Sequence, residues 1–210
     1  MTTPPAAVAA PGPERTAAGD AEPAVVERET IDPRFVADVK ATFASYKEWG
    51  RVDDERRWAP ALCRLPNAPR VTMSHADDGG HARKLYSLFA KDREGYVKLL
   101  GPNTKPAVGQ VIAKESYLPE LVEGAAAEPG DHSSGLVRTA VHDGKHYRAT
   151  KMLGLYVMRR MPLQTPGTDD GWIYGTLTPD GEVTSAGRVA SCMGCHASAK
   201  HGRLFGRNGE

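Results

Sequence analysis

The segment Cys192–His196 near the C-terminus reads Cys-Met-Gly-Cys-His. Two thiols one helical turn apart can each add to a vinyl group of haem, and the adjacent imidazole can bind the iron. The run therefore predicts one covalently attached haem c. Cys192 and Cys195 are the expected tethers, and His196 is the expected iron ligand.

Two other chemistries use similar residues. A thioredoxin-like Cys-x-x-Cys pair normally follows an early strand in a βαβ pattern, whereas this pair lies close to the chain end without that pattern. A structural zinc site needs two ligands beyond Cys192 and Cys195. Cys63 and one of the remaining histidines would have to supply them: His75, His81, His132, His142, His146 or His201. The haem interpretation needs no further ligand from the protein and is preferred.

The composition fits one domain of ordinary size. The chain has 210 residues, 40% of them hydrophobic, which is enough for a core. Its 27 basic and 26 acidic residues are mixed along the sequence and give a formal net charge of +1. This balance gives no electrostatic basis for binding nucleic acid or an anionic membrane, so a small-molecule partner is expected. No stretch approaches the roughly 18 apolar residues that span a bilayer, so no membrane span is expected.

Haem attachment of this type takes place outside the bacterial cytoplasm, so we expect a periplasmic or otherwise extracytoplasmic protein. Residues 1–20, however, lack the basic and apolar regions of a secretion signal. Three explanations are open: a signal absent from the given start, a misplaced start codon, or a motif that holds no haem. We favour the first two.

The chain divides into a tail and a domain. Residues 1–30 are rich in Ala, Pro, Thr and Glu and have no apolar period, which predicts a disordered tether. Residues 31–210 form the expected haem-c-binding domain. Asp32 followed by Pro33 is a helix-start signal, and a helix over about 33–48 is predicted from apolar residues at helical spacing: Phe35, Val39, Phe43 and Tyr46.

The middle of the chain changes to the pattern of short strands. Segments rich in β-branched and aromatic residues are separated by Gly, Pro and Asp clusters and lie at 85–89, 110–113, 153–158 and 172–175. Residues 179–181, Pro-Asp-Gly, predict a hairpin turn before Val183. The expected fold is α+β: a single domain with an antiparallel sheet, an N-terminal amphipathic helix and a C-terminal haem-attachment helix.

Four segments, taken in order, resemble landmarks of the cytochrome P-460 family, which includes the sheet-type cytochromes c prime beta. They are His81–Tyr86 with Phe89–Ala90, then Val108–Glu115, Gly171–Gly175 and Cys192–His196. The resemblance covers about residues 35–205. It implies a β-rich domain with a C-terminal haem, and a homodimer.

The resemblance gives Lys114 a special role. In founding members of the family a lysine is bonded to the haem rim, and those proteins oxidise hydroxylamine; Lys114 is the position that looks equivalent. From the residues alone, Lys114 ends an apolar strand on the face of Val108 and Ile112, so its stem could run inward along the sheet. The alternative is an ordinary strand-end lysine in contact with solvent or Glu115.

The side of the haem opposite His196 would decide between reactions. The cytochromes c prime beta cap it with phenylalanine, and Phe89 is the expected cap here. Hydroxylamine oxidation is helped by a nearby carboxylate that accepts protons. Residues 183–191 contain no Asp or Glu, so Glu115 and Glu182 are the nearest acidic residues in sequence.

We therefore expect a mono-haem c-type cytochrome with an open distal site at its His196-ligated iron. It would bind and oxidise a small nitrogen compound, hydroxylamine or nitric oxide, and pass electrons to an external acceptor. One alternative is non-catalytic binding of nitric oxide or carbon monoxide. Another is electron transfer, which needs a second axial ligand from residues such as Met152, Met158 or Met161. Cys63 is assigned no function.

Overall fold

The computed structural model describes residues 30–52, 71–73, 84–99, 104–123 and 139–205. The fold is α+β and forms a single domain, as the sequence predicts. Its sheet has seven strands, all paired antiparallel, in the order β1-β2-β3-β5-β6-β7 with β4 beside β5. The strands are β1 (Thr72–Met73), β2 (Leu85–Ala90), β3 (Val111–Val122), β4 (Thr139–His142), β5 (Lys145–Arg160), β6 (Trp172–Leu177) and β7 (Val183–Gly187).

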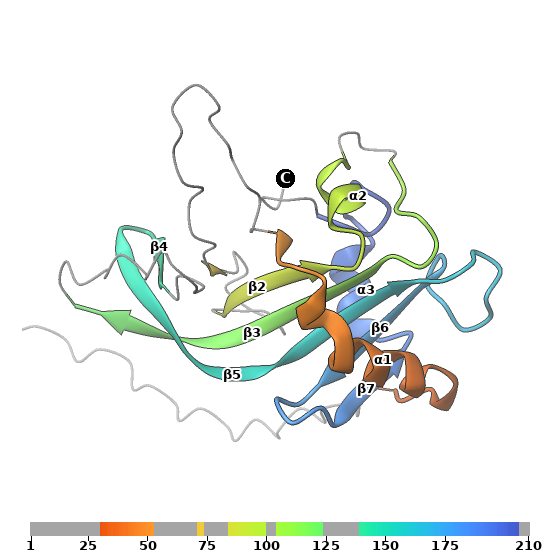
Figure 1. Cartoon of the computed structure of the whole chain (residues 1–210), viewed down its shortest axis with the longest axis horizontal. Helices are drawn as coiled ribbons and strands as arrows, with labels where there is room; N and C mark the ends of the chain where they lie inside the picture. Colours follow the sequence, from red (N-terminus) through yellow and green to blue (C-terminus); the bar gives the residue numbers. More distant parts are fainter. Residues whose placement is uncertain (1–29, 53–70, 74–83, 100–103, 124–138, 206–210) are drawn as a thin grey trace, which may run out of the picture.

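In the described residues, four helical segments accompany the sheet: α1 (Pro33–Ser45), the 3-10 turn η1 (Tyr46–Glu48), α2 (Arg93–Val97) and α3 (Ala190–His196). α1 lies on one face of the sheet, here called the α1 face, and α3 lies on the other, the α3 face (Figure 1). The predicted helix over 33–48 is confirmed, with its last three residues wound as η1. Because α3 follows the edge strand β7 closely, the sheet fixes where the Cys-x-x-Cys-His segment begins.

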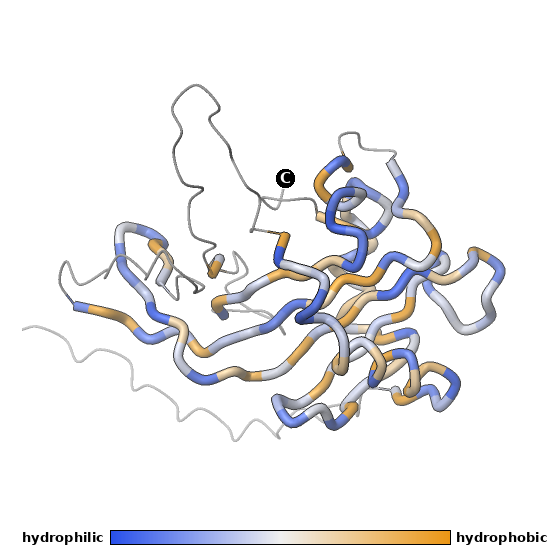
Figure 2. Tube along the Cα trace, viewed as in Figure 1, coloured by the Kyte–Doolittle hydropathy of each residue, from blue (hydrophilic) through white to orange (hydrophobic). Residues whose placement is uncertain are grey.

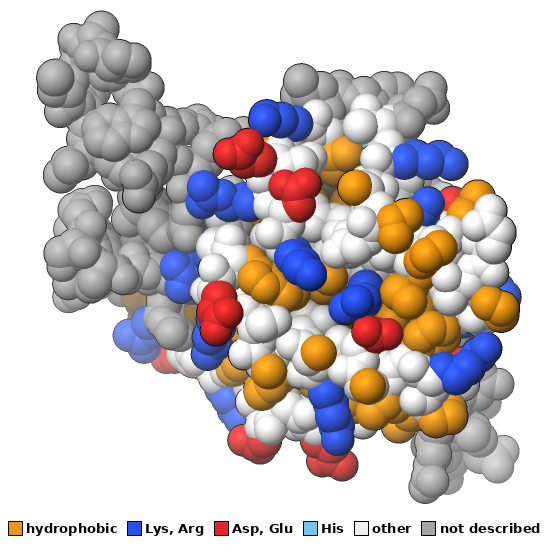
Figure 3. All heavy atoms as spheres, turned by 45° about the vertical axis from the view of Figure 1, so that its right-hand side comes forward, with side chains coloured by type: hydrophobic (Ala, Val, Ile, Leu, Met, Phe, Trp, Pro, Cys, Tyr) orange, Lys and Arg blue, Asp and Glu red, His pale blue; other side chains and the backbone are white. Residues whose placement is uncertain are grey.

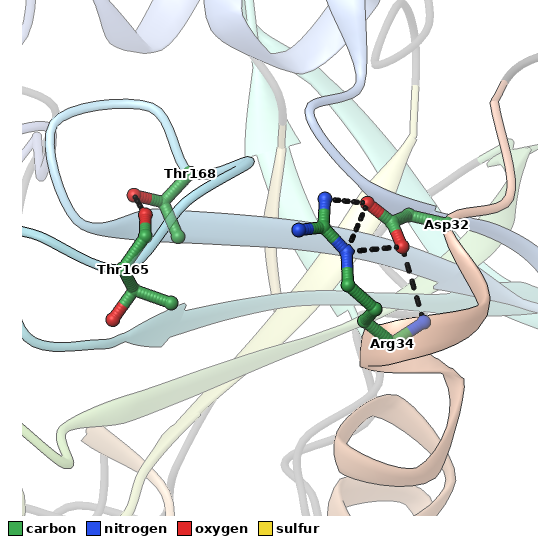
Figure 4. A network of polar contacts seen from close by, with 4 residues as sticks. All are labelled: Asp32, Arg34, Thr165 and Thr168. Atoms are coloured by element: carbon green, nitrogen blue, oxygen red, sulfur yellow. Dashed lines mark hydrogen bonds and ion pairs between the residues drawn. The ribbon is translucent and has the colours of Figure 1, made fainter.

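The start of α1 is tied to the sheet. Asp32 caps the helix by accepting from the backbone N–H of Arg34 at 3.1 Å, and Pro33 occupies the first turn, where no N–H is required. The Asp32 backbone N–H also donates to Ala186 in β7 at 2.9 Å. In Figure 4 the Arg34 guanidinium lies between Asp32 and the loop in which the Thr168 hydroxyl donates to the Thr165 carbonyl at 2.8 Å. α1 is therefore fixed by its cap as well as by its buried side chains.

Each face of the sheet has its own core, because successive side chains of a strand point to opposite faces. On the α1 face, Phe35 and Val39 of α1 pack with Ala113, Leu155 and Val157 of the central strands. On the α3 face the buried cluster contains Ala90, Ile112, Met158, Trp172, Tyr174, Val189 and Leu204. Apolar positions accordingly follow the central strands in Figure 2.

The four predicted strand segments coincide with strands apart from Gln110, which comes just before β3, and the observed strands are longer. β3 has 12 residues and β5 has 16, so their outer halves continue beyond the helices as a ribbon that β4 joins (Figure 1). The turn between β4 and β5 uses Asp143 and Gly144, both with positive φ, which is typical of a tight hairpin. The hairpin predicted at residues 179–181 is confirmed between β6 and β7.

Two predictions concern residues outside the described ranges. The tether assigned to residues 1–30 lies there except for its last residue, and so does Cys63. In the described part of the chain, every helix falls short of the length and apolarity needed to cross a lipid bilayer. Acidic and basic side chains are interspersed on the face seen in Figure 3, consistent with the net charge of +1.

The contact between α1 and β6 depends on a glycine. A Cβ added at Gly175 would lie 2.6 Å from Cγ2 of Val39, so Gly175→Ala forces the buried valine to move. We expect Gly175→Ala to lower the free energy of unfolding by about 1–3 kcal/mol in urea titrations. In a Val39→Ala background the same change should cost less, because the two methyl groups are gone. Equal costs in the two backgrounds would contradict this explanation.

Candidate haem site

α3 presents the two cysteines of the motif on one side of the helix. Backbone N–H groups of Cys192 and Met193 both donate to the Val189 carbonyl, at 3.1 and 3.0 Å, which sets the first turn. Residues three positions apart are neighbours on a helix surface, so Cys192 and Cys195 lie side by side. Both carry thiols rather than a disulfide; Cys192 is half-buried and Cys195 is exposed. The pair is therefore available for thioether formation.

One side of α3 is packed against the sheet. Cys192 and Met193 contact the apolar cluster of the α3 face, which includes Met158, Trp172 and Tyr174. This contact fixes the helix relative to β5 and β6 before any group is attached.

His196, at the C-terminal end of α3, is held in one tautomer. Its Nδ1 lies 2.7 Å from the backbone carbonyl oxygen of Arg203. A carbonyl can only accept, so Nδ1 carries the proton and the lone pair of Nε2 is available to a metal. Burial lowers the pKa of His196, and the positive charge of Lys114 acts in the same direction. Both effects favour the neutral imidazole that metal binding requires.

Two aromatic rings lie close to this imidazole. The ring centroid of Tyr174 is 5.8 Å from that of His196, and the Phe205 centroid is 5.0 Å away. The segment after α3 is fixed to β6 through the indole of Trp172, whose Nε1 donates to the Gly202 carbonyl at 2.9 Å. The histidine is thus confined by β6 and by the chain that follows it.

Four half-buried side chains at the middle of the sheet point to the α3 face. Tyr86, Leu88, Lys114 and Tyr156, here called the floor, come from β2, β3 and β5. Lys114 pairs with Leu88 and with Tyr156 across the sheet, and it lies two residues from Ile112, so all are on the α3 face. On the α1 face of the same strands, by contrast, Leu155 is fully buried. The centre of the sheet is therefore covered by protein on one face and only half-covered on the other.

Lys114 has an unusual environment. Its Nζ lies 4.2 Å from the centroid of the Tyr86 ring, a cation–π contact. Burial lowers the pKa of Lys114 to about 8, and the charge of Lys84 contributes to the shift. Lys84 itself donates from Nζ to the Tyr156 hydroxyl at 2.7 Å. The Lys114 amine therefore loses its proton at a lower pH than the amine of an exposed lysine.

No family model matches this chain, and no curated protein matches it.

The structure does not bring Phe89 or Glu115 to the floor. Phe89 lies on the α1 face, with its ring edge-on to Tyr46 at 5.0 Å. Glu115 also lies there and is buried, where it accepts hydrogen bonds from the hydroxyls of Tyr46, at 2.6 Å, and Tyr117. The reason is the two-residue period: Leu88 and Lys114 face α3, so their neighbours Phe89 and Glu115 face away. Leu88, rather than Phe89, is the apolar β2 residue beside Lys114.

Glu182 is also distant from α3. It is exposed in the turn between β6 and β7, where its backbone N–H donates to the Thr178 hydroxyl at 3.1 Å. The neighbouring Gly181 packs against Phe43 of α1. The full length of β7 separates this turn from α3.

Four residues around His196 were not predicted as site residues from the sequence: Asp169, Tyr174, Arg203 and Phe205. Tyr174 and Arg203 both bond to Asp169, at 2.9 and 2.8 Å. The only local signal was the dipeptide Asp170-Gly171, which is typical of a tight turn and places Asp169 just before β6.

In the described ranges, no three His, Cys, Asp or Glu side chains gather as ligands for one metal ion. The zinc alternative depends on Cys63 and stays untested.

These residues fit a c-type haem. Two adjacent thiols can form thioethers, Nε2 of a neutral imidazole can bind iron, and the half-buried floor offers apolar and aromatic surface to a planar group. The fit rests on the Nδ1 hydrogen bond of His196 and on the incomplete cover of the α3 face.

The low pKa of Lys114 predicts a pH dependence of stability. Because the pKa is about 8 in the fold and ordinarily 10.5, the folded chain binds fewer protons than the unfolded chain between these values. The free energy of unfolding should therefore rise as the pH increases from about 8 to 10.5. In haem-free protein, Lys114→Met should remove this contribution to the slope measured by urea titration, whereas Lys151→Met, at an exposed position of β5, should keep it. An unchanged slope in Lys114→Met would show that burial does not disfavour its charge.

Proposed function

We propose that the protein is a mono-haem c-type cytochrome that binds a small nitrogen compound, hydroxylamine or nitric oxide, at a His196-ligated iron. The observation that carries the proposal is the hydrogen bond of 2.7 Å from His196 Nδ1 to the Arg203 carbonyl. His196 lies on the same short helix, α3, as Cys192 and Cys195. The hydrogen bond leaves Nε2 as the ligand atom beside two thiols. The cytochrome P-460 family, which the sequence resembles, uses the same set of residues at its C-terminus.

Each part of the site has a defined task in this proposal. Cys192 and Cys195 tether the haem covalently, and His196 binds its iron. When bound, the haem supplies an iron that can take a small ligand and exchange electrons with an external acceptor. The protein then determines access and proton transfer through the floor and the side chains next to it.

The oxidation of hydroxylamine releases protons and electrons, so it needs a base as well as an electron acceptor. Lys114 is the residue of the floor best suited to accept a proton, because burial lowers its pKa to about 8. Glu115 cannot substitute for Lys114 because it is bonded to Tyr46 on the other face.

Non-catalytic binding of nitric oxide or carbon monoxide is the second candidate. Leu88, on the floor, and the buried Ile112 and Met158 beside it give this face an apolar character, which favours uncharged diatomic ligands. Met158 is also the only one of the three predicted methionine ligands that belongs to the α3-face cluster; Met152 and Met161 pack against the core of the α1 face. An electron-transfer role would therefore depend on Met158.

The haem assignment is tested by producing the full chain in a host with haem-c maturation machinery outside the cytoplasm. We expect an intact mass increased by one haem that survives denaturation. Cys192→Ala and Cys195→Ala should each lose one thioether, and the double variant should lose covalent haem altogether. Cys63→Ala is the matched control and should retain it. A wild-type chain without haem, made beside a control cytochrome that is loaded, would refute the assignment.

The role of Lys114 is tested on the haem-loaded protein. With Lys114→Met we expect hydroxylamine-dependent reduction of an electron acceptor to fall by about 100-fold or more, the range that a general base contributes. Binding of nitric oxide to the ferrous form should persist. Lys151→Met is the control for loss of a positive charge. If the wild-type protein binds nitric oxide but reduces no acceptor, the non-catalytic candidate replaces the enzyme.

A further inference from the structure

Two tight turns meet beside His196. In the first, Asp169 and Trp172 exchange backbone hydrogen bonds of 2.8 and 2.9 Å around Asp170 and Gly171, with φ of 47° and 77°. Positive φ at both central residues is the geometry of a type I′ turn, and Asp-Gly is a preferred sequence for it.

The second turn has the same form. His201 and Leu204 exchange backbone hydrogen bonds of 3.2 and 3.4 Å around Gly202 and Arg203, with φ of 58° and 79°. Arg203 is the unusual member, because a residue other than Gly, Asn or Asp in this conformation is strained by about 1–2 kcal/mol. The surrounding structure must therefore hold it there.

A side-chain ion pair joins the two turns. Nη2 of Arg203 lies 2.8 Å from Oδ1 of Asp169, and the two side chains are only 21% and 12% exposed. The indole of Trp172 adds a second link through its bond to the Gly202 carbonyl. The strained backbone of Arg203 is thus fixed by its own guanidinium and by the residue that precedes it.

The other oxygen of Asp169 binds a second neighbour of the histidine, Tyr174. Oδ2 accepts from the Tyr174 hydroxyl at 2.9 Å. Burial raises the pKa of Tyr174, and the hydrogen bond to Asp169 adds to the effect, so the phenol keeps its proton and donates. One carboxylate therefore holds both Tyr174, whose ring adjoins His196, and Arg203, whose carbonyl binds Nδ1.

We propose that Asp169 is the positioning residue of the iron ligand: by holding Arg203 in its strained turn, it keeps a carbonyl on Nδ1 of His196. That bond fixes the ring orientation and increases the electron density that Nε2 offers to iron. The inference rests on the proposed haem site and adds to it a control over the iron–histidine bond that none of the motif residues provides.

The test compares haem-loaded wild type with Asp169→Asn and Arg203→Met, which both remove the ion pair and leave residue 203 with a strained backbone. In both variants we expect the iron–histidine stretching band of the ferrous protein, measured by resonance Raman spectroscopy, to shift to lower wavenumber. The reduction potential should shift upward, because a weaker donor stabilises ferric iron less. Glycine suits the backbone of residue 203 and keeps its carbonyl, so Arg203→Gly, which also lacks the ion pair, should stay closer to wild type in both measurements.

Glu120→Gln is the matched control, because it removes the acid of an exposed ion pair with Arg148, 3.4 Å long, on the outer ribbon. It should change neither the Raman band nor the potential. Haem content, measured by intact mass, separates the two levels of the proposal. A wild type without haem refutes the proposed site. Full haem content with an unshifted band and potential in both Asp169→Asn and Arg203→Met refutes the positioning role alone.

Discussion

The candidate site depends on one hydrogen bond, from the imidazole Nδ1–H of His196 to the Arg203 carbonyl. A histidine with both nitrogens exposed to solvent can change tautomer and rotate, whereas one whose Nδ1 is held presents Nε2 in a single direction. Because the acceptor belongs to a turn and not to a mobile side chain, its position is set by the backbone around it. The packing of α3 and the turn at residues 201–204 both serve to keep this pair of atoms together.

The sheet gives the second constraint through the different cover of its two faces. α1 closes one face, where Val39 packs directly on the Gly175 backbone and a buried carboxylate is bonded by two phenols. The other face carries α3 at one end, while the floor residues at its centre stay half-buried. A lysine kept partly neutral among tyrosines is a costly arrangement for stability alone. Such an arrangement is typical of a functional site and agrees with the proposal that a planar cofactor covers this face.

Much of the fold could be predicted from sequence because its signals are local. The Asp32-Pro33 helix start, the strands rich in β-branched and aromatic residues, and the Pro-Asp-Gly turn each depend on neighbours in the chain, and the structure has all three. The Cys-Met-Gly-Cys-His run is equally local, since attachment needs only adjacent residues on one helix. Its haem remains a prediction.

The arrangement around the motif could not be predicted in the same way. Whether Leu88 or Phe89 faces the site depends on the register between β2 and β3, and a shift of one residue exchanges the two faces. Asp169 and Arg203 are 34 positions apart and meet only because two turns are brought together by β6 and α3. Sequence spacing alone gives no sign of such a contact.

The most direct test is a crystal structure of the haem-loaded protein with anomalous scattering measured at the iron absorption edge. The account predicts one iron, bound by Nε2 of His196, with Nδ1 still bonded to the Arg203 carbonyl and the haem against the floor on the α3 face. Iron bound by another residue, or a haem attached to Cys192 and Cys195 with His196 turned away from it, would contradict the account.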